Sequence, residues 1–133
     1  MNLQTVTTLK STIAQIKRLK KGESVSYNRK AIVERKSMIA TIRIGYADGY
    51  PRRLGNGGGK VWVNGKLAPI IGTICMDMFM IDIRDIENIK EGDDVIIFGI
   101  QLPVQQVAKW ANTIPYEIMT GISQRVKRVY FEE

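Results

Sequence analysis

Residues 60–71 read KVWVNGKLAPII, two short runs rich in strand-forming residues joined by Asn64-Gly65. Asn-Gly is the dipeptide that best suits the two positive φ angles of a type I′ turn, the tight connection between antiparallel strands. Val, Ile and Trp on either side of it favour the pleated, half-buried surface of a sheet. The sequence therefore predicts a β-hairpin that turns at residues 64–65.

Alternating apolar side chains extend the β prediction to both sides of this hairpin. Residues 38–44 and 73–82 carry apolar side chains at every second position, which is the period of a strand. Successive side chains of a strand point to opposite faces. In the second run we therefore expect Cys75 and Asp77 on one face and Met76 on the other.

Four more segments complete the predicted elements. Residues 4–20 have partly helical spacing, but their Thr, Val and Ser content favours a strand, and residues 95–99 (VIIFG) indicate a short buried strand. Residues 103–112 predict a helix opened by a proline, and residues 125–131 (RVKRVYF) a closing strand. The helix would turn four small or branched side chains inward: Val104, Val107, Ala108 and Ala111.

At least five strands with few helices predict a mainly β fold. A small closed or nearly closed β-barrel is the natural packing, because closure removes exposed strand edges. One or two helices should lie near the C-terminus. We expect a single domain spanning residues 1–133, since 44% apolar and 25% charged residues are ordinary values for a globular protein.

Composition also limits the chemistry. The chain has one cysteine, Cys75, and no histidine, which excludes an internal disulfide, the usual zinc sites and histidine-based triads. We expect no metal site, and acid–base work would fall to Asp, Glu, Lys, Tyr or Cys. The glycine run at residues 54–60 lacks the pattern of a phosphate-binding loop. No membrane-spanning run or signal pattern is present, which favours the cytoplasm.

Basic residues are concentrated in the first half of the chain. Residues 1–66 hold 14 Lys and Arg against 3 Asp and Glu, whereas residues 67–133 hold 6 against 10. A basic patch suits a nucleic acid, an anionic small molecule or an acidic partner domain. A basic β-barrel that binds RNA is thus an alternative, supported by KRLKK at residues 17–21. It is weakened because aromatic residues are only 8% of the chain. A regulatory remnant without catalysis is a third class.

Four motifs carry a more specific signal. They are SYNRK at 26–30, RIGYADGYPRR at 43–53, GTICMDMFMID at 72–82 and NTIPYEIMTGISQRVKR at 112–128. In this order and spacing they resemble the C-terminal domain of alanine racemases, the pyridoxal phosphate enzymes that interconvert L- and D-alanine for peptidoglycan synthesis. The resemblance covers nearly the whole chain. The SYN form is similar to racemase halves fused to a cell-wall peptide ligase, which leaves such a fusion as one possible parent.

The resemblance implies a domain that completes an enzyme rather than a whole enzyme. In that family an N-terminal α/β barrel carries the lysine that binds the cofactor, and the β domain of one subunit completes the active site of its partner in a homodimer. Such a barrel needs about 250 residues and does not fit within 133. The isolated chain is therefore expected to be inactive. Its partners would be the barrel, a second subunit and alanine, with no membrane or nucleic acid.

The resemblance also assigns roles to residues. Tyr27 matches the tyrosine that removes the α-proton of L-alanine, Tyr46 a tyrosine at the substrate entry, and Tyr116 a tyrosine at the cofactor phosphate. The run Cys75-Met76-Asp77 matches the family's C-M-D, which faces the substrate carboxylate. These are the catalytic, substrate-binding and cofactor-binding residues that the sequence predicts.

Tyr27 needs help to act as a base. The unperturbed pKa of a phenol is about 10, and lowering it to about 7 requires roughly 4 kcal/mol of preference for the phenolate. Asn28, Arg29 and Lys30 follow it, where the family usually has glycine and a second tyrosine. Because neighbours on a strand point to opposite faces, we expect the cation that lowers this pKa to come from the barrel instead.

Overall fold

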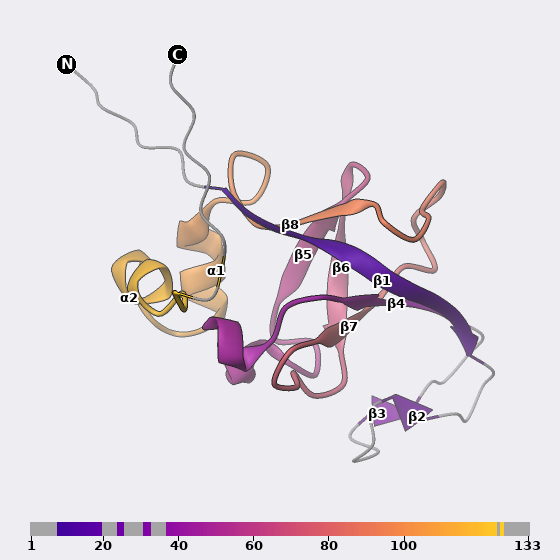
Figure 1. Cartoon of the computed structure of the whole chain (residues 1–133), viewed down its shortest axis with the longest axis horizontal. Coiled ribbons are helices and arrows are strands. Elements are labelled where there is room, and N and C mark those ends of the chain that lie inside the picture. Colours follow the sequence, from indigo (N-terminus) through magenta and orange to yellow (C-terminus); the bar gives the residue numbers. More distant parts are fainter. Residues whose placement is uncertain (1–7, 20–23, 26–30, 33–36, 125, 127–133) are drawn as a thin grey trace.

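The computed structural model describes residues 8–19, 24–25, 31–32, 37–124 and 126 (Figure 1). In this part of the chain, six antiparallel strands close into a barrel in the order β1-β4-β7-β6-β5-β8. Their bounds are Leu9–Leu19 (β1), Ser37–Ile42 (β4), Lys60–Val63 (β5), Lys66–Ile71 (β6), Phe79–Asp82 (β7) and Asp94–Phe98 (β8). Strands β2 (Ser24–Val25) and β3 (Ala31–Ile32) pair with each other outside the barrel. The predicted mainly β, closed barrel is confirmed.

The predicted hairpin is present as β5 and β6. Asn64 and Gly65 have φ angles of 46° and 85°, and Val63 pairs with Lys66 directly beside the turn. Two consecutive positive φ angles are what a type I′ turn requires. The Asn-Gly dipeptide thus sets the register of this hairpin.

Long strand β1 closes the barrel. It pairs with β4 along one edge and with β8 along the other, so it runs across the barrel wall in Figure 1. The remaining seam joins β5 to β8 and has a single ladder pair, Trp62 with Ile96. The strand predicted at residues 4–20 is confirmed where the structure describes it, from Leu9.

Alternate residues of the strands fill the barrel. The largest buried side chains include Phe79, Ile13, Ile42, Ile70, Ile81 and Ile97. Helix α1 (Val104–Trp110) begins after Pro103 and buries Val107 and Ala108 against this core. Helix α2 (Pro115–Thr120) follows, so the two helices near the C-terminus are confirmed. The closing strand predicted at 125–131 falls, except for Val126, outside the described residues.

The prediction of one strand over residues 73–82 is wrong for its first part. Strand β7 begins only at Phe79, and residues 73–78 form a loop in which the Cys75 N–H donates to the Met78 carbonyl at 2.9 Å. The carbonyls of Cys75 and Met76 accept hydrogen bonds from the turn at residues 46–47 instead of from a strand. Met76 and its neighbours therefore do not alternate across a sheet.

None of the described helices is both long and apolar enough to cross a membrane.

Candidate functional site

The two ends of strand β6 lie at two different ends of the barrel. It starts at the Asn64-Gly65 turn. We call this turn and residues 83–93 together the hairpin end. The finish of β6 leads into the loop at residues 72–78, close to the 3₁₀ turn η1 (Tyr46–Asp48). We call this second region, defined by Tyr46, residues 72–78 and Tyr116 of α2, the tyrosine end. It holds every predicted site residue that the structure describes.

Gly45 brings two of the motifs into contact. A Cβ at this position would lie 2.3 Å from the Cys75 carbonyl oxygen and 2.5 Å from that of Met76, so no larger residue fits. This close approach allows two hydrogen bonds: the Tyr46 N–H donates to the Cys75 carbonyl at 3.0 Å, and the Ala47 N–H donates to the Met76 carbonyl at 2.8 Å. Tyr46 is thereby fixed beside the C-M-D run by main-chain atoms.

The buried Asp48 side chain stabilises the same turn. Its Oδ2 accepts a hydrogen bond from the Gly45 N–H at 3.0 Å. The Asp48 carbonyl oxygen accepts from the Ser123 N–H at 2.9 Å. Gly49, with φ of 101°, lies so close to Gly121 that a Cβ would meet the Gly121 carbonyl oxygen at 2.1 Å. These contacts attach the segment that follows α2 to the turn that carries Tyr46.

Large apolar side chains are exposed at this end. Met76 is 55% exposed and Tyr116 73% exposed, and Tyr46 is partly exposed with the Arg52 guanidinium 5.1 Å above its ring. Such a stack is a cation–π contact. Further exposed apolar residues nearby in sequence are Met78, Ile114 and Met119. Apolar surface that is gathered in one region is typical of a binding site or of an interface.

The predicted site residues divide into three groups. Tyr46, Cys75 and Met76 are brought together by the hydrogen bonds at Gly45. Asp77 is exposed in the same loop, and the half-buried Cys75 thiol lies 3.8 Å from the Thr73 carbonyl oxygen. Tyr116 belongs to α2, and the segment after α2 contacts the turn through Gly121 and Ser123. Tyr27 lies outside the described residues, so its predicted role stays a prediction.

Tyr50 was not singled out from the sequence. It stacks on Phe79, with ring centroids 5.1 Å apart, and burial raises the pKa of its hydroxyl above the ordinary value. Its Oη, like the Oγ1 of Thr73, is buried without a hydrogen-bond partner in the part of the chain that the structure describes. The sequence holds no signal for this, because tyrosine on a barrel rim and tyrosine inside it look alike. Asp48, in contrast, is expected from the sequence to fix a loop, and it does so by accepting from the Gly45 N–H as in a capping box.

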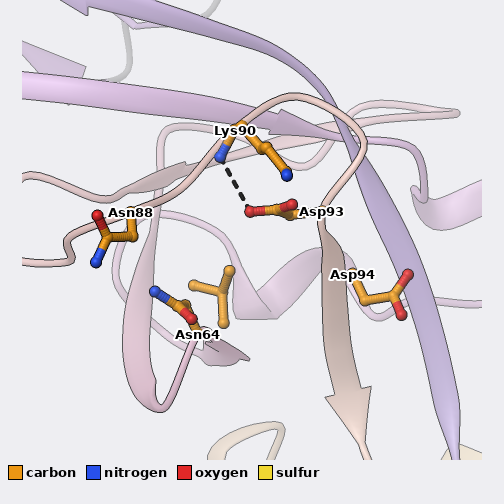
Figure 2. Close-up of a pocket in the computed structure, with 6 residues that line it drawn as sticks. Asn64, Asn88, Lys90, Asp93 and Asp94 are labelled. Carbon is orange, nitrogen blue, oxygen red and sulfur yellow. Dashed lines mark hydrogen bonds between the residues drawn. The ribbon is translucent and has the colours of Figure 1, made fainter.

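An open cavity of about 350 Å³ lies at the hairpin end (Figure 2). Its polar groups are engaged in local bonds: the Lys90 N–H donates to Asp93 Oδ2 at 3.0 Å, and Asn64 Nδ2 donates to the Glu87 carbonyl at 2.5 Å. Asp94 pairs with Lys10 at 3.5 Å. No cluster of three potential metal ligands occurs among the described residues. The tyrosine end is therefore the better candidate.

At the level of class, the chain is a small closed β-barrel domain with two C-terminal helices and exposed tyrosine side chains at one end. Comparison with known families agrees. The family described as "Alanine racemase, C-terminal domain" matches residues 6–130. The chain belongs to this family.

Individual relatives give the same result. The chain is 44% identical to the alanine racemase of Clostridium tetani over 137 aligned positions, covering 100% of this chain but 35% of that protein. A crystal structure of alanine racemase from Bartonella henselae with covalently bound pyridoxal phosphate superposes with a TM-score of 0.89 at 38% identity, covering 93% of this chain and 34% of that one. For alanine racemase of Clostridium difficile 630 the TM-score is 0.87 at 42% identity, covering 93% and 32%. The chain thus spans about a third of the relatives that it matches.

Proposed function

We propose that residues 1–133 form the C-terminal domain of a pyridoxal phosphate-dependent alanine racemase that makes D-alanine for cell-wall peptide synthesis. The supporting observation is the family match over residues 6–130 combined with the uncovered tyrosine end. In this proposal that end packs against an N-terminal barrel domain, in a homodimer. The family match accounts for the motifs that the RNA-binding alternative leaves unexplained, so we do not propose that alternative.

The tyrosine end has suitable donors for the cofactor. Tyr116 follows Pro115 in the first turn of α2 and is 73% exposed, and neither its hydroxyl nor that of Tyr46 is bonded to any described residue. A phenol can donate to a phosphate oxygen while its ring excludes water. These residues fit the group, and we assign Tyr116 to its phosphate. Bound pyridoxal phosphate supplies the electron sink that makes the α-proton of an amino acid acidic.

The other residues would orient the substrate and move a proton. Tyr46 and Met76 are both exposed on segments joined by main-chain hydrogen bonds. They would shape the entry for a small amino acid, with the Cys75-Met76-Asp77 loop facing its carboxylate. Racemisation requires a proton acceptor on each side of a planar α-carbon. We assign the L side to Tyr27, by its motif, and the D side to a lysine of the N-terminal barrel. The exposed Arg52, stacked on Tyr46, adds positive charge near this entry.

The experiment uses the full-length protein that carries this chain, with Tyr27→Phe as the variant. Net racemisation should fall in both directions by ~10²–10⁴-fold, because each direction uses both proton acceptors once. The informative readout is exchange of the α-proton with deuterated solvent, followed by NMR. D-alanine should still exchange, whereas L-alanine should exchange far more slowly than in the unmodified protein.

Tyr116→Phe is the matched control, since it also removes one hydroxyl. It should leave the ratio of L to D exchange unchanged and weaken retention of pyridoxal phosphate on dialysis. Unaltered exchange of both enantiomers by the Tyr27→Phe protein would make Tyr27 a structural residue. Absence of racemase activity from the unmodified full-length protein would refute the proposed function as a whole.

A further inference from the structure

The chain contains two Asn-Gly dipeptides with similar φ angles. Asn56 and Asn64 are both exposed, with φ angles of 55° and 46°. Gly57 and Gly65 follow them with φ angles of 84° and 85°, and a Cβ added to either glycine would meet nothing within 4 Å. Both asparagines are therefore followed by a small residue in open space.

The two dipeptides differ in how the N–H group of the glycine is bonded. The Gly57 N–H donates to the Ile70 carbonyl at 2.8 Å, which fixes that nitrogen in the wall of the barrel. The Gly65 N–H, at the tip of the hairpin, makes no hydrogen bond to the residues that the structure describes. Because hydrogen-bonded N–H groups are withheld from reaction with nearby groups until the structure opens locally, the nitrogen of Gly65 is the freer nucleophile.

We propose that Asn64 is a site of spontaneous deamidation in the folded domain. The Gly65 backbone nitrogen loses its proton and bonds to Asn64 Cγ, while the Cγ–Nδ2 bond breaks and Nδ2 leaves with a proton as ammonia. Water then opens the five-membered imide. Cleavage at Cγ gives aspartate, and cleavage at the main-chain carbonyl gives isoaspartate, in which the chain runs through the side chain. The overall change consumes one water and releases one ammonia.

The position of Asn64 makes this change consequential. Its Nδ2 donates to the Glu87 carbonyl, a bond that a carboxylate cannot make. Asp93 and Asp94 line the same cavity, with Lys90 as the one cationic lining residue among those described (Figure 2), so the new carboxylate adds a third negative charge to this cavity. Isoaspartate also lengthens the two-residue turn between β5 and β6. Since β5 is joined to β8 by the single pair Trp62–Ile96, the modification weakens the side of the barrel with the fewest ladder pairs.

Trypsin separates the two sites for a direct test. Cleavage after Arg53, Lys60 and Lys66 gives adjacent peptides, LGNGGGK at 54–60 and VWVNGK at 61–66. The 133-residue chain is incubated in mildly alkaline buffer, with and without denaturant, and amide-to-acid conversion is followed by mass spectrometry against an unincubated sample. In the folded chain the 61–66 peptide should convert several-fold faster than the 54–60 peptide. In denaturant the two rates should converge.

Equal conversion of the two peptides in the folded chain, or faster conversion of 54–60, would overturn the proposal. Two variants test the structural consequence: Asn64→Asp should lower the thermal midpoint by ~2–5 °C, whereas Asn56→Asp should leave it nearly unchanged. An unchanged midpoint for Asn64→Asp would refute the weakening of the barrel. The proposal is independent of the proposed racemase function, since it needs only the folded domain and water.

Discussion

The hairpin end and the tyrosine end satisfy their polar groups in different ways. At the hairpin end, polar side chains cap nearby main-chain groups: Asn64 binds the Glu87 carbonyl, Lys66 the Asp85 carbonyl, and Asp93 the Lys90 N–H. At the tyrosine end, apart from the Asp48 carboxylate that accepts from the Gly45 N–H, main-chain atoms bind one another, and the side chains of Tyr46, Met76 and Tyr116 are left exposed. Polar groups at the first end are satisfied locally, whereas the second end exposes three large side chains, as the proposed packing against an N-terminal barrel domain requires.

This difference predicts where substitutions will be tolerated. Main-chain contacts that leave no room for a Cβ make the backbone of the tyrosine end intolerant of change, while its exposed side chains contribute little to the stability of the domain. Exposed side-chain hydrogen bonds contribute only modestly, about 0.5–1.5 kcal/mol each. At the tyrosine end we therefore expect the glycine positions to affect stability and the exposed side chains to affect function.

Gly45→Ala should have the largest effect on stability. Its Cβ would overlap the Cys75 and Met76 carbonyl oxygens, so the turn must move, at a cost of about 3 kcal/mol. Urea unfolding followed by tryptophan fluorescence measures this loss. Gly99→Ala is the control, because the atoms nearest to its Cβ would belong to the Thr8 side chain, at 3.0–3.4 Å, and not to the backbone. Equal losses for the two variants would mean that the tyrosine end is not rigid.

Tyr50→Phe should change stability by less and in the opposite direction. Its hydroxyl is buried without a partner among the described residues, so removing it should stabilise the domain by about 1 kcal/mol near neutral pH. The phenyl ring keeps the stack on Phe79. Urea unfolding again gives the difference, and a loss of stability would show that the hydroxyl does have a partner.

The same residue predicts an alkaline pH dependence. Burial raises the pKa of Tyr50 above its ordinary value of about 10, so the folded state keeps a proton that the unfolded state releases. The free energy of unfolding is therefore unaffected by this ionisation below pH ~10. It falls as pH rises through and above that value, by up to about 1.4 kcal/mol per pH unit. The Tyr50→Phe chain should lack this component. Parallel stability curves for the two chains above pH ~10 would contradict it.

Met76→Lys should have the smallest effect on the isolated chain. Met76 is 55% exposed, and surface substitutions usually change stability by no more than about 0.5 kcal/mol. In the full-length protein the same lysine would be buried without a partner, and racemisation should fall at least ~10-fold. Leu67→Lys, at an exposed apolar position of β6, is the matched control and should change neither quantity. Unaltered racemisation by Met76→Lys would show that this side chain stays uncovered.

Local patterns sufficed for much of the fold. The hairpin followed from Asn64-Gly65, the strands β1, β4 and β8 from composition and alternation, and α1 from Pro103 and its apolar spacing. Each depends on interactions within a few residues or on burial of one face. The loop at 73–78 could not be predicted in this way, because its apolar residues alternate as in a strand. The Cys75 and Met76 carbonyls accept hydrogen bonds from the turn at 46–47, which is distant in the sequence.

The motifs placed Tyr46 and the Cys75-Met76-Asp77 run in one predicted site. The structure brings these two segments into contact through main-chain hydrogen bonds, and the roles of the residues stay predictions. It was not evident that Gly45 brings the two segments together, because the contacts responsible join segments about 30 residues apart in the sequence. Tyr27 was predicted from its motif alone, and its role depends on the exchange experiment.

The main-chain frame around Tyr46 also bears on how the domain can diversify. The bonds from Tyr46 to Cys75, from Ala47 to Met76 and from Ser123 to Asp48 use only backbone atoms. Such a frame survives replacement of the side chains that it displays, provided that the glycines remain. This agrees with a TM-score of 0.89 at only 38% identity. Libraries that randomise Tyr46, Met76 and Tyr116 together should therefore yield mostly folded members, which makes this rim a good starting point for directed evolution.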